Sequence, residues 1–150
     1  PKGFGEVLER IKTWLDEEGF RYAQIIGKQA HNTLFNYLVT LPSGTTINIF
    51  QLSNKKDSIC ISTGLIFTSE QMRLFSQKTK TERNEILSEM RFKLASVDVE
   101  FSFAGGEIPN TIRIDHPIYY DALSKDRFFK AIAAVFKAFN MAGWVLTQSL

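Results

Sequence analysis

The segment SKDRFFKAIAAVFKAFNMAGWVL, residues 124–146, decides the fold of this chain. At about 100° per residue, its large apolar side chains fall within an arc of roughly 160° on one side of a helix. The members of this stripe are Phe128, Phe129, Ile132, Val135, Phe136, Phe139 and Leu146. A helix with one apolar side packs that side against another layer of the protein. The segment therefore predicts a long C-terminal helix whose phenylalanine-rich side lies across a sheet.

The segments before this helix predict the sheet. Strand patterns bounded by turn residues occur at 20–26, 34–41, 45–52 and 59–67. Pro42-Ser43-Gly44 predicts a hairpin turn between the second and third of these strands. Strict alternation from Val97 to Phe103 predicts a further strand with one buried face. A return strand follows the loop at 104–110, and we expect Pro117 to end it or to place it at an edge of the sheet.

Helices are predicted at the start and in the middle of the chain. Residues 5–18 carry an apolar stripe, and two capping boxes, Thr68 with Gln71 and Thr79 with Glu82, begin the middle segments. The predicted fold class is therefore α+β, with a single domain over residues 1–150. In it, a twisted, mainly antiparallel sheet of about six strands is covered on one face by helices. The predicted core includes Ile11, Trp14, Phe128, Ile132, Val135, Phe136 and Phe139.

Composition limits the classes of function. The formal net charge is +2 and basic residues are interleaved with acidic ones, which argues against nucleic-acid binding. The single cysteine, Cys60, rules out an internal disulfide framework and favours a reducing compartment. The first four residues show no apolar signal core, and the most apolar stretch, 131–146, is interrupted by polar residues. We therefore expect a cytoplasmic protein without a membrane segment.

No catalytic, metal-binding or phosphate-binding motif stands out. Asp115 and His116 are adjacent in a predicted strand, so their side chains should point to opposite faces and not form a catalytic pair. We expect His31 in a loop, Cys60 as a buried apolar residue, and Gly105-Gly106 as a turn. The sequence therefore predicts no catalytic residue, no cofactor and no metal.

Four residues form a candidate pocket for the alternative interpretation, a small-ligand binder or an enzyme: His116, Tyr119, Tyr120 and Glu107. The two tyrosines directly precede the C-terminal helix, where they either line a cleft or cover the edge of the core. A pocket with convergent polar groups beside His116 would favour this alternative.

A second candidate site is a partner-binding surface on two helices. Met141 and Trp144 lie opposite the apolar stripe of the last helix, and Phe92 falls off the stripe of the middle one. Exposed aromatic and methionine side chains are typical of contact surfaces. The other interpretation is that the helix end folds against the domain and buries Met141 and Trp144. If the surface is exposed, self-association is its simplest use.

The order of the elements and the segment YDALSKDRFF, residues 120–129, carry a resemblance to a known fold. The chain resembles the secretion-chaperone-like fold, including YbjN-type domains, and within it an uncharacterised, mainly archaeal family of unknown function. This resemblance covers nearly the whole chain. It implies an α+β layer pair, a dimer, and binding of an extended segment of a partner protein, but it brings no catalytic residue. The chain departs from the pattern in being slightly basic and in the extra short strand at 20–26.

From these observations we expect a non-catalytic protein-binding or chaperone-like adaptor module that forms homodimers. It would hold a protein segment by a sheet edge or an apolar groove. Neither nucleic acid nor a membrane is an expected partner.

Overall fold

The structure is a computed structural model and describes residues 3–150. Residues 1–2 lie outside the described residues. They are part of the N-terminal segment in which we expected no apolar signal core. The chain forms two compact units. The first combines Pro1–Ser62 with His116–Ile132, and the second combines Thr63–Asp115 with Ala133–Leu150. The single-domain prediction stays a prediction, which one cooperative unfolding transition would support.

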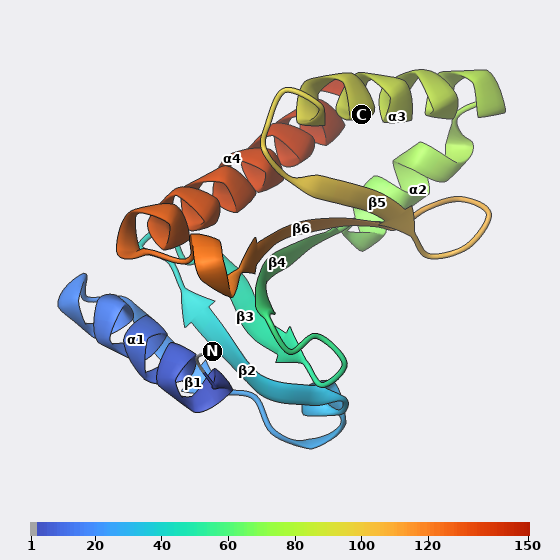
Figure 1. Cartoon of the computed structure of the whole chain (residues 1–150). Helices are drawn as coiled ribbons and strands as arrows, with labels where there is room; N and C mark the ends of the chain where they lie inside the picture. Colours follow the sequence, from blue (N-terminus) through green and yellow to red (C-terminus); the bar gives the residue numbers. More distant parts are fainter. Residues whose placement is uncertain (1–2) are drawn as a thin grey trace. The chain divides into compact units, whose positions relative to one another are not determined.

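Six strands form one sheet in the order β1-β2-β3-β4-β6-β5. They are β1 (Arg21–Gln24), β2 (Thr33–Thr40), β3 (Thr46–Leu52), β4 (Ser58–Ile66), β5 (Glu100–Ala104) and β6 (Thr111–Tyr119). Within residues 3–150 the α-helices are α1 (Phe4–Glu17), α2 (Ser69–Gln77), α3 (Lys80–Leu94) and α4 (Lys125–Ser149). The predicted α+β fold class and the predicted order of elements are confirmed (Figure 1).

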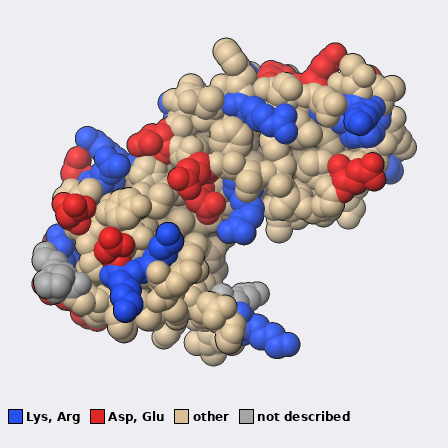
Figure 2. All heavy atoms as spheres, turned by 45° about the vertical axis from the view of Figure 1, so that its right-hand side comes forward, with Lys and Arg blue, Asp and Glu red and all other residues tan. Residues whose placement is uncertain are grey.

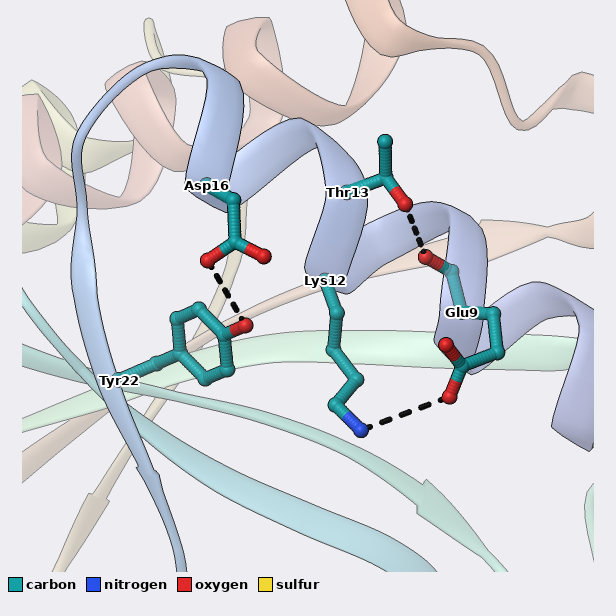
Figure 3. Close-up of polar contacts among 5 residues, drawn as sticks. All are labelled: Glu9, Lys12, Thr13, Asp16 and Tyr22. Atoms are coloured by element: carbon teal, nitrogen blue, oxygen red, sulfur yellow. Dashed lines mark hydrogen bonds and ion pairs between the residues drawn. The ribbon is translucent and has the colours of Figure 1, made fainter.

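In the first unit, α1 lies along β1 and β2 (Figure 1). Its buried residues are Val7, Ile11 and Leu15, at the three-to-four residue spacing of one helix face. The Tyr22 hydroxyl of β1 donates to Asp16 Oδ1 at 2.9 Å, and Lys12 pairs with Glu9 at 3.5 Å (Figure 3). The ammonium of Lys12 also lies 5.7 Å from the ring centroid of Tyr37 on β2. Polar contacts and apolar burial therefore fix α1 on the same strands.

An aromatic cluster joins the first turns of α4 to the rest of the first unit. Phe128 is fully buried, with its ring centroid 5.6 Å from that of Trp14 and 5.2 Å from that of Phe129. Phe129 in turn stacks on Phe20 at 5.6 Å. The residue with which the predicted stripe begins, Phe128, is thus a core residue of this unit.

Helices α2 and α3 lie in the second unit, and a threonine caps the N-terminus of each. Thr68 Oγ1 accepts from Gln71 N at 3.1 Å, and Gln71 Oε1 accepts from Thr68 N at 2.9 Å. Thr79 and Glu82 exchange the same two bonds at the start of α3. Each box pairs two N–H groups near the start of the helix, and both predicted capping boxes are confirmed.

Replacing Thr79 with alanine should lower the free energy of unfolding by about 1 kcal/mol, because the side chain that accepts from Glu82 N is removed. Thr13→Ala is the matched control. Thr13 is exposed inside α1 and donates only to the Glu9 carbonyl, and alanine is the better helix former there. Urea denaturation measures both variants, and equal losses would contradict a capping role for Thr79.

The core of the second unit is formed by apolar faces of helices and strands. Its helical members are Phe75, Ile86, Leu87, Met90, Leu94, Val135, Ala138, Ala142, Val145 and Leu146. Phe75 of α2 meets Phe67 edge to face at 5.6 Å. The Arg91 guanidinium lies 4.8 Å from the ring centroid of Phe103, which places α3 beside β5.

Two strand predictions need correction. The strand predicted from Val97 begins only at Glu100, because Val97 N–H donates back to the Leu94 carbonyl at 3.0 Å in a turn that follows the end of α3. Pro117 does not end β6, which continues to Tyr119 and lies between β4 and β5 in the sheet. Pro117 is tolerated because it lies beyond Asp115, where pairing with β5 stops.

Part of the predicted core was also wrong. Trp14, Phe136 and Phe139 are half-buried. The buried side of α4 is centred on Ala138 and Ala142, which leaves the rings of Phe136 and Phe139 at its margin. Ile11, Phe128, Ile132 and Val135 are buried as predicted.

Helix α4 is long and apolar enough to cross a membrane by length and composition alone. Core helices of globular proteins can meet the same criterion. In this structure the apolar side of α4, with Phe128, Val135 and Leu146, is packed inside the protein. This side of α4 is part of the core.

Candidate functional site

The face of the molecule drawn in Figure 2 carries interspersed basic and acidic side chains, without a broad area of one charge. A pocket in the first unit is a clearer candidate site. It has a volume of about 690 Å³ and lies where α1, the turn between β3 and β4, and the connection from β6 to α4 meet. Its lining residues are Arg10, Lys56, Asp57, Tyr119, Tyr120, Asp121 and Leu123.

A buried glutamine holds two walls of this pocket together. Gln51 is 1% exposed, and its Oε1 accepts a hydrogen bond from the Tyr120 hydroxyl. Gln51 Nε2 donates to the Lys55 carbonyl at 2.6 Å, and Tyr120 N–H donates to the Asp57 carbonyl at 2.7 Å. The β3–β4 turn is therefore fixed to the connection before α4, and Lys56 and Asp57 are held with it.

Four charged side chains line the pocket: Arg10, Lys56, Asp57 and Asp121. None of them takes part in the ion pairs formed among residues 3–150. The Arg10 guanidinium lies 5.0 Å from the ring centroid of Trp14, a cation–π contact that helps to place it. The pocket thus offers two positive and two negative groups to a ligand.

Replacing Tyr120 with phenylalanine should lower the free energy of unfolding by about 1–3 kcal/mol. The change removes the hydroxyl that donates to Gln51 Oε1 and leaves a buried amide oxygen without that donor. Tyr119→Phe is the matched control, since Tyr119 is 57% exposed and should tolerate the loss of its hydroxyl. Chemical denaturation of both variants measures the difference, and a Tyr120→Phe variant as stable as the control would contradict the role of Gln51.

Two tyrosines have shifted acidities. Burial raises the pKa of Tyr120 above its usual value of 10.0, and nearby Asp57 also raises it. Burial also raises the pKa of Tyr22, to which its hydrogen bond to Asp16 adds. Both hydroxyls therefore hold their protons more tightly in the folded protein than in the unfolded chain.

These shifts predict a loss of stability at alkaline pH. Between the unfolded and folded pKa values the folded state binds more protons, so the free energy of unfolding falls as pH rises above about 10. The contribution of the tyrosines is complete below that pH. Urea melts from about pH 8 to about pH 11 should show the fall, and Tyr120→Phe should make it less steep. An identical slope in the variant would contradict the shift at Tyr120.

Of the four residues in the predicted pocket, the structure brings two together. Tyr119 and Tyr120 line the pocket described above. His116 does not: it is 5% exposed and shares the buried face of β6 with Ile114 and Ile118. Glu107 belongs to the second unit, in the loop between β5 and β6, and is exposed.

The predicted partner-binding residues lie in the second unit. Phe92 is 83% exposed on α3 and Trp144 is 61% exposed on α4, while Met141 is half-buried. The Lys93 ammonium lies 5.3 Å from the ring centroid of Trp144, so α3 and α4 are neighbours at this point. The helix end does not bury Trp144, which leaves the indole ring accessible.

The other residues considered from the sequence lie apart from the pocket lining. Cys60 is half-buried on β4, and His31 is exposed after a short 3₁₀ turn. Among residues 3–150 no three or more His, Cys, Asp and Glu side chains are grouped to hold a metal ion.

Sequence reasoning missed Arg10, Lys56, Asp57, Asp121 and Gln51. A signal for Gln51 was present, because it occupies an inward position in the alternation of β3, where an apolar residue is expected. A buried amide needs a partner, so this position pointed to a polar contact of some kind. The charged residues come from three segments far apart in the chain, and no local pattern joins them.

A family model described as an uncharacterised conserved protein, DUF2299, matches residues 7–146. The crystal structure of an uncharacterised protein from Methanothermobacter thermautotrophicus is similar, with a TM-score of 0.84 and 31% identity over 93% of this chain and 96% of that one. YbjN, a putative transcription regulator from E. coli, has a TM-score of 0.45 and 10% identity over 93% and 89%, which is too distant to support an inference. No curated protein matches. Because the family model spans nearly all of the chain, the chain belongs to the uncharacterised conserved family DUF2299.

Proposed function

We propose that the protein is a non-catalytic protein-binding module that works as a homodimer through the outer sides of α3 and α4. The observation that carries the proposal is the exposure of Phe92 and Trp144, two large aromatic side chains of the second unit. Aromatic residues are enriched in contact surfaces, where their burial supplies much of the binding energy.

Each aromatic residue ends a stripe along its helix. The acidic stripe of α3 consists of Glu85, Glu89 and Phe92, and the basic stripe of α4 consists of Lys137, Met141 and Trp144. In both, the first two residues lie seven and three positions before the aromatic one, which puts them on the same side of the helix. All except Met141 are exposed.

A second copy of the chain fits these stripes better than an unrelated partner. In a dimer with two-fold symmetry, the acidic stripe of one protomer faces the basic stripe of the other, and the same contact occurs twice. Lys93 lies between the stripes, with its ammonium 5.3 Å from the Trp144 ring centroid and 3.9 Å from Glu89 Oε1. Both complementary surfaces are therefore present, side by side, on one chain.

Sedimentation velocity over a range of concentrations tests the dimer. The native protein should dimerise, and Trp144→Ala should weaken dimerisation at least about tenfold, whereas Phe4→Ala, a change at an exposed ring of α1, should not. A Trp14→Phe variant leaves Trp144 as the sole tryptophan, and its fluorescence should shift to shorter wavelength as the dimer forms. A protein that remains monomeric at every concentration overturns the proposal.

Charge reversal tests the pairing of the stripes. Glu85→Lys and Lys137→Glu should each weaken dimerisation by about tenfold, and the two changes in one chain should restore it. Glu6→Lys on α1 is the matched control and should have no effect. If neither charge reversal weakens dimerisation, the dimer uses another surface and the proposed surface is refuted.

A further inference from the structure

The lining of the pocket in the first unit shares no residue with the proposed dimer surface, and its chemistry points to a second activity. Its lining combines two cations, Arg10 and Lys56, with two anions, Asp57 and Asp121. None of these four side chains is used in an ion pair among the described residues. The exposed ring of Tyr119 completes the wall, and a volume of about 690 Å³ suits a small organic molecule.

The balance of charges decides the class of ligand. A pocket with equal numbers of positive and negative groups favours a ligand that is neutral overall but carries both signs. The planar guanidinium of Arg10 matches a carboxylate, which it can bind with two hydrogen bonds. Asp57 and Asp121 match an ammonium group, and the Tyr119 ring offers a face for an aromatic side chain. A nucleotide, with a net charge of about −2 on its phosphate, would meet two carboxylates.

Hydrogen bonds between protein groups hold the pocket walls in place. The Tyr120 hydroxyl and Gln51 amide join the β3–β4 turn to the connection before α4, and Tyr120 N–H bonds the Asp57 carbonyl at 2.7 Å. The ring of Trp14 supports Arg10 at 5.0 Å. A preformed site of this kind loses less entropy on binding than a mobile one.

We infer that this pocket binds a zwitterionic ligand with an aromatic side chain, namely an aromatic α-amino acid or a short peptide with both charged ends. The carboxylate of the ligand lies towards Arg10 and Lys56, and its ammonium group towards Asp57 and Asp121.

Saturation-transfer NMR and calorimetry with the whole protein test this inference. The probes are L-phenylalanine, 3-phenylpropionate, 2-phenylethylamine, the dipeptide phenylalanyl-phenylalanine and adenosine monophosphate. Phenylalanine or the dipeptide should bind at least about tenfold more tightly than either analogue with one charge. Tighter binding of the dipeptide assigns the site to peptides, and tighter binding of phenylalanine assigns it to free amino acids. Preference for the nucleotide, or equal binding of all probes, overturns the inference.

Neighbouring lysines give a matched pair of variants. Lys56→Gln should weaken binding of the preferred probe at least about tenfold, whereas Lys55→Gln, whose side chain is outside the lining, should leave it unchanged. Asp121→Asn should weaken binding of phenylalanine but not of 3-phenylpropionate, which has no ammonium group. These exposed positions tolerate the substitutions, and dimerisation measured in the same samples keeps this test independent of the proposed function. Equal effects of Lys56→Gln and Lys55→Gln would refute the site.

Discussion

Replacing Phe128 with alanine should lower the free energy of unfolding by about 3–5 kcal/mol. The ring is 0% exposed and packs against the rings of Trp14 and Phe129, at 5.6 and 5.2 Å between centroids. Its removal loses the burial of an aromatic side chain and leaves a cavity between α1 and the first turns of α4. Urea or guanidinium denaturation measures the loss as a lower midpoint with an unchanged slope.

Phe92→Ala is the matched control for this change. The same atoms are removed from a side chain that is 83% exposed, so the stability of the monomer should change by less than about 0.5 kcal/mol. Phe136→Ala should fall between the two, since Phe136 is half-buried. A loss below about 1 kcal/mol at Phe128 would contradict its place in the core.

Local signals were sufficient to predict much of the fold. The capping boxes at Thr68 and Thr79 are defined within four residues of sequence, and both occur where predicted. The hairpin at Pro42-Ser43-Gly44 likewise depends on a short turn, in which Gly44 takes a φ of 91°. Such signals act before any distant contact forms, so they can be recognised from the sequence alone.

Predictions that depended on distant contacts were less successful. Val97 alternates with polar neighbours as a strand residue would, but its N–H donates to the Leu94 carbonyl in a turn that follows the end of α3. The effect of Pro117 depends on where β5 stops pairing, which no local pattern reveals. Phe136 was assigned to the core from the width of the apolar stripe, but packing of α4 selects the side with the alanines.

For the candidate pocket too, local signals in the sequence were recognised and distant contacts were not. Tyr119 and Tyr120 were predicted because they are adjacent aromatic residues before a helix, and His116 was included as a histidine close to them in sequence. Alternation along β6 instead turns His116 into the core. Arg10 and Lys56 meet the tyrosines through tertiary folding, and their charges gave no sign of a shared site.

The second large effect is expected at Gly105, in the loop between β5 and β6. Gly105→Ala should lower the free energy of unfolding by about 2–4 kcal/mol. The residue has a φ of 111°, which L side chains rarely adopt, and a Cβ there would lie 1.9 Å from Asn110 Oδ1. Asn110 cannot simply move away, because its N–H donates to the Ala104 carbonyl at 3.0 Å and its Oδ1 accepts from Thr111 at 2.9 Å.

A variant at Gly106 distinguishes backbone strain from the steric clash as causes of the loss at Gly105. Its φ is 110°, nearly that of Gly105, but a Cβ there has no atom within 4 Å. Gly106→Ala should therefore show only the backbone strain, about 1–2 kcal/mol, and the extra loss at Gly105 measures the clash with Asn110. Adding Asn110→Ala should recover part of the loss of Gly105→Ala, since it removes the nearest atoms of the clash. If denaturation gives equal losses for the two glycine variants and no recovery in the double variant, Asn110 does not pack against Gly105 and the hairpin loop has another conformation.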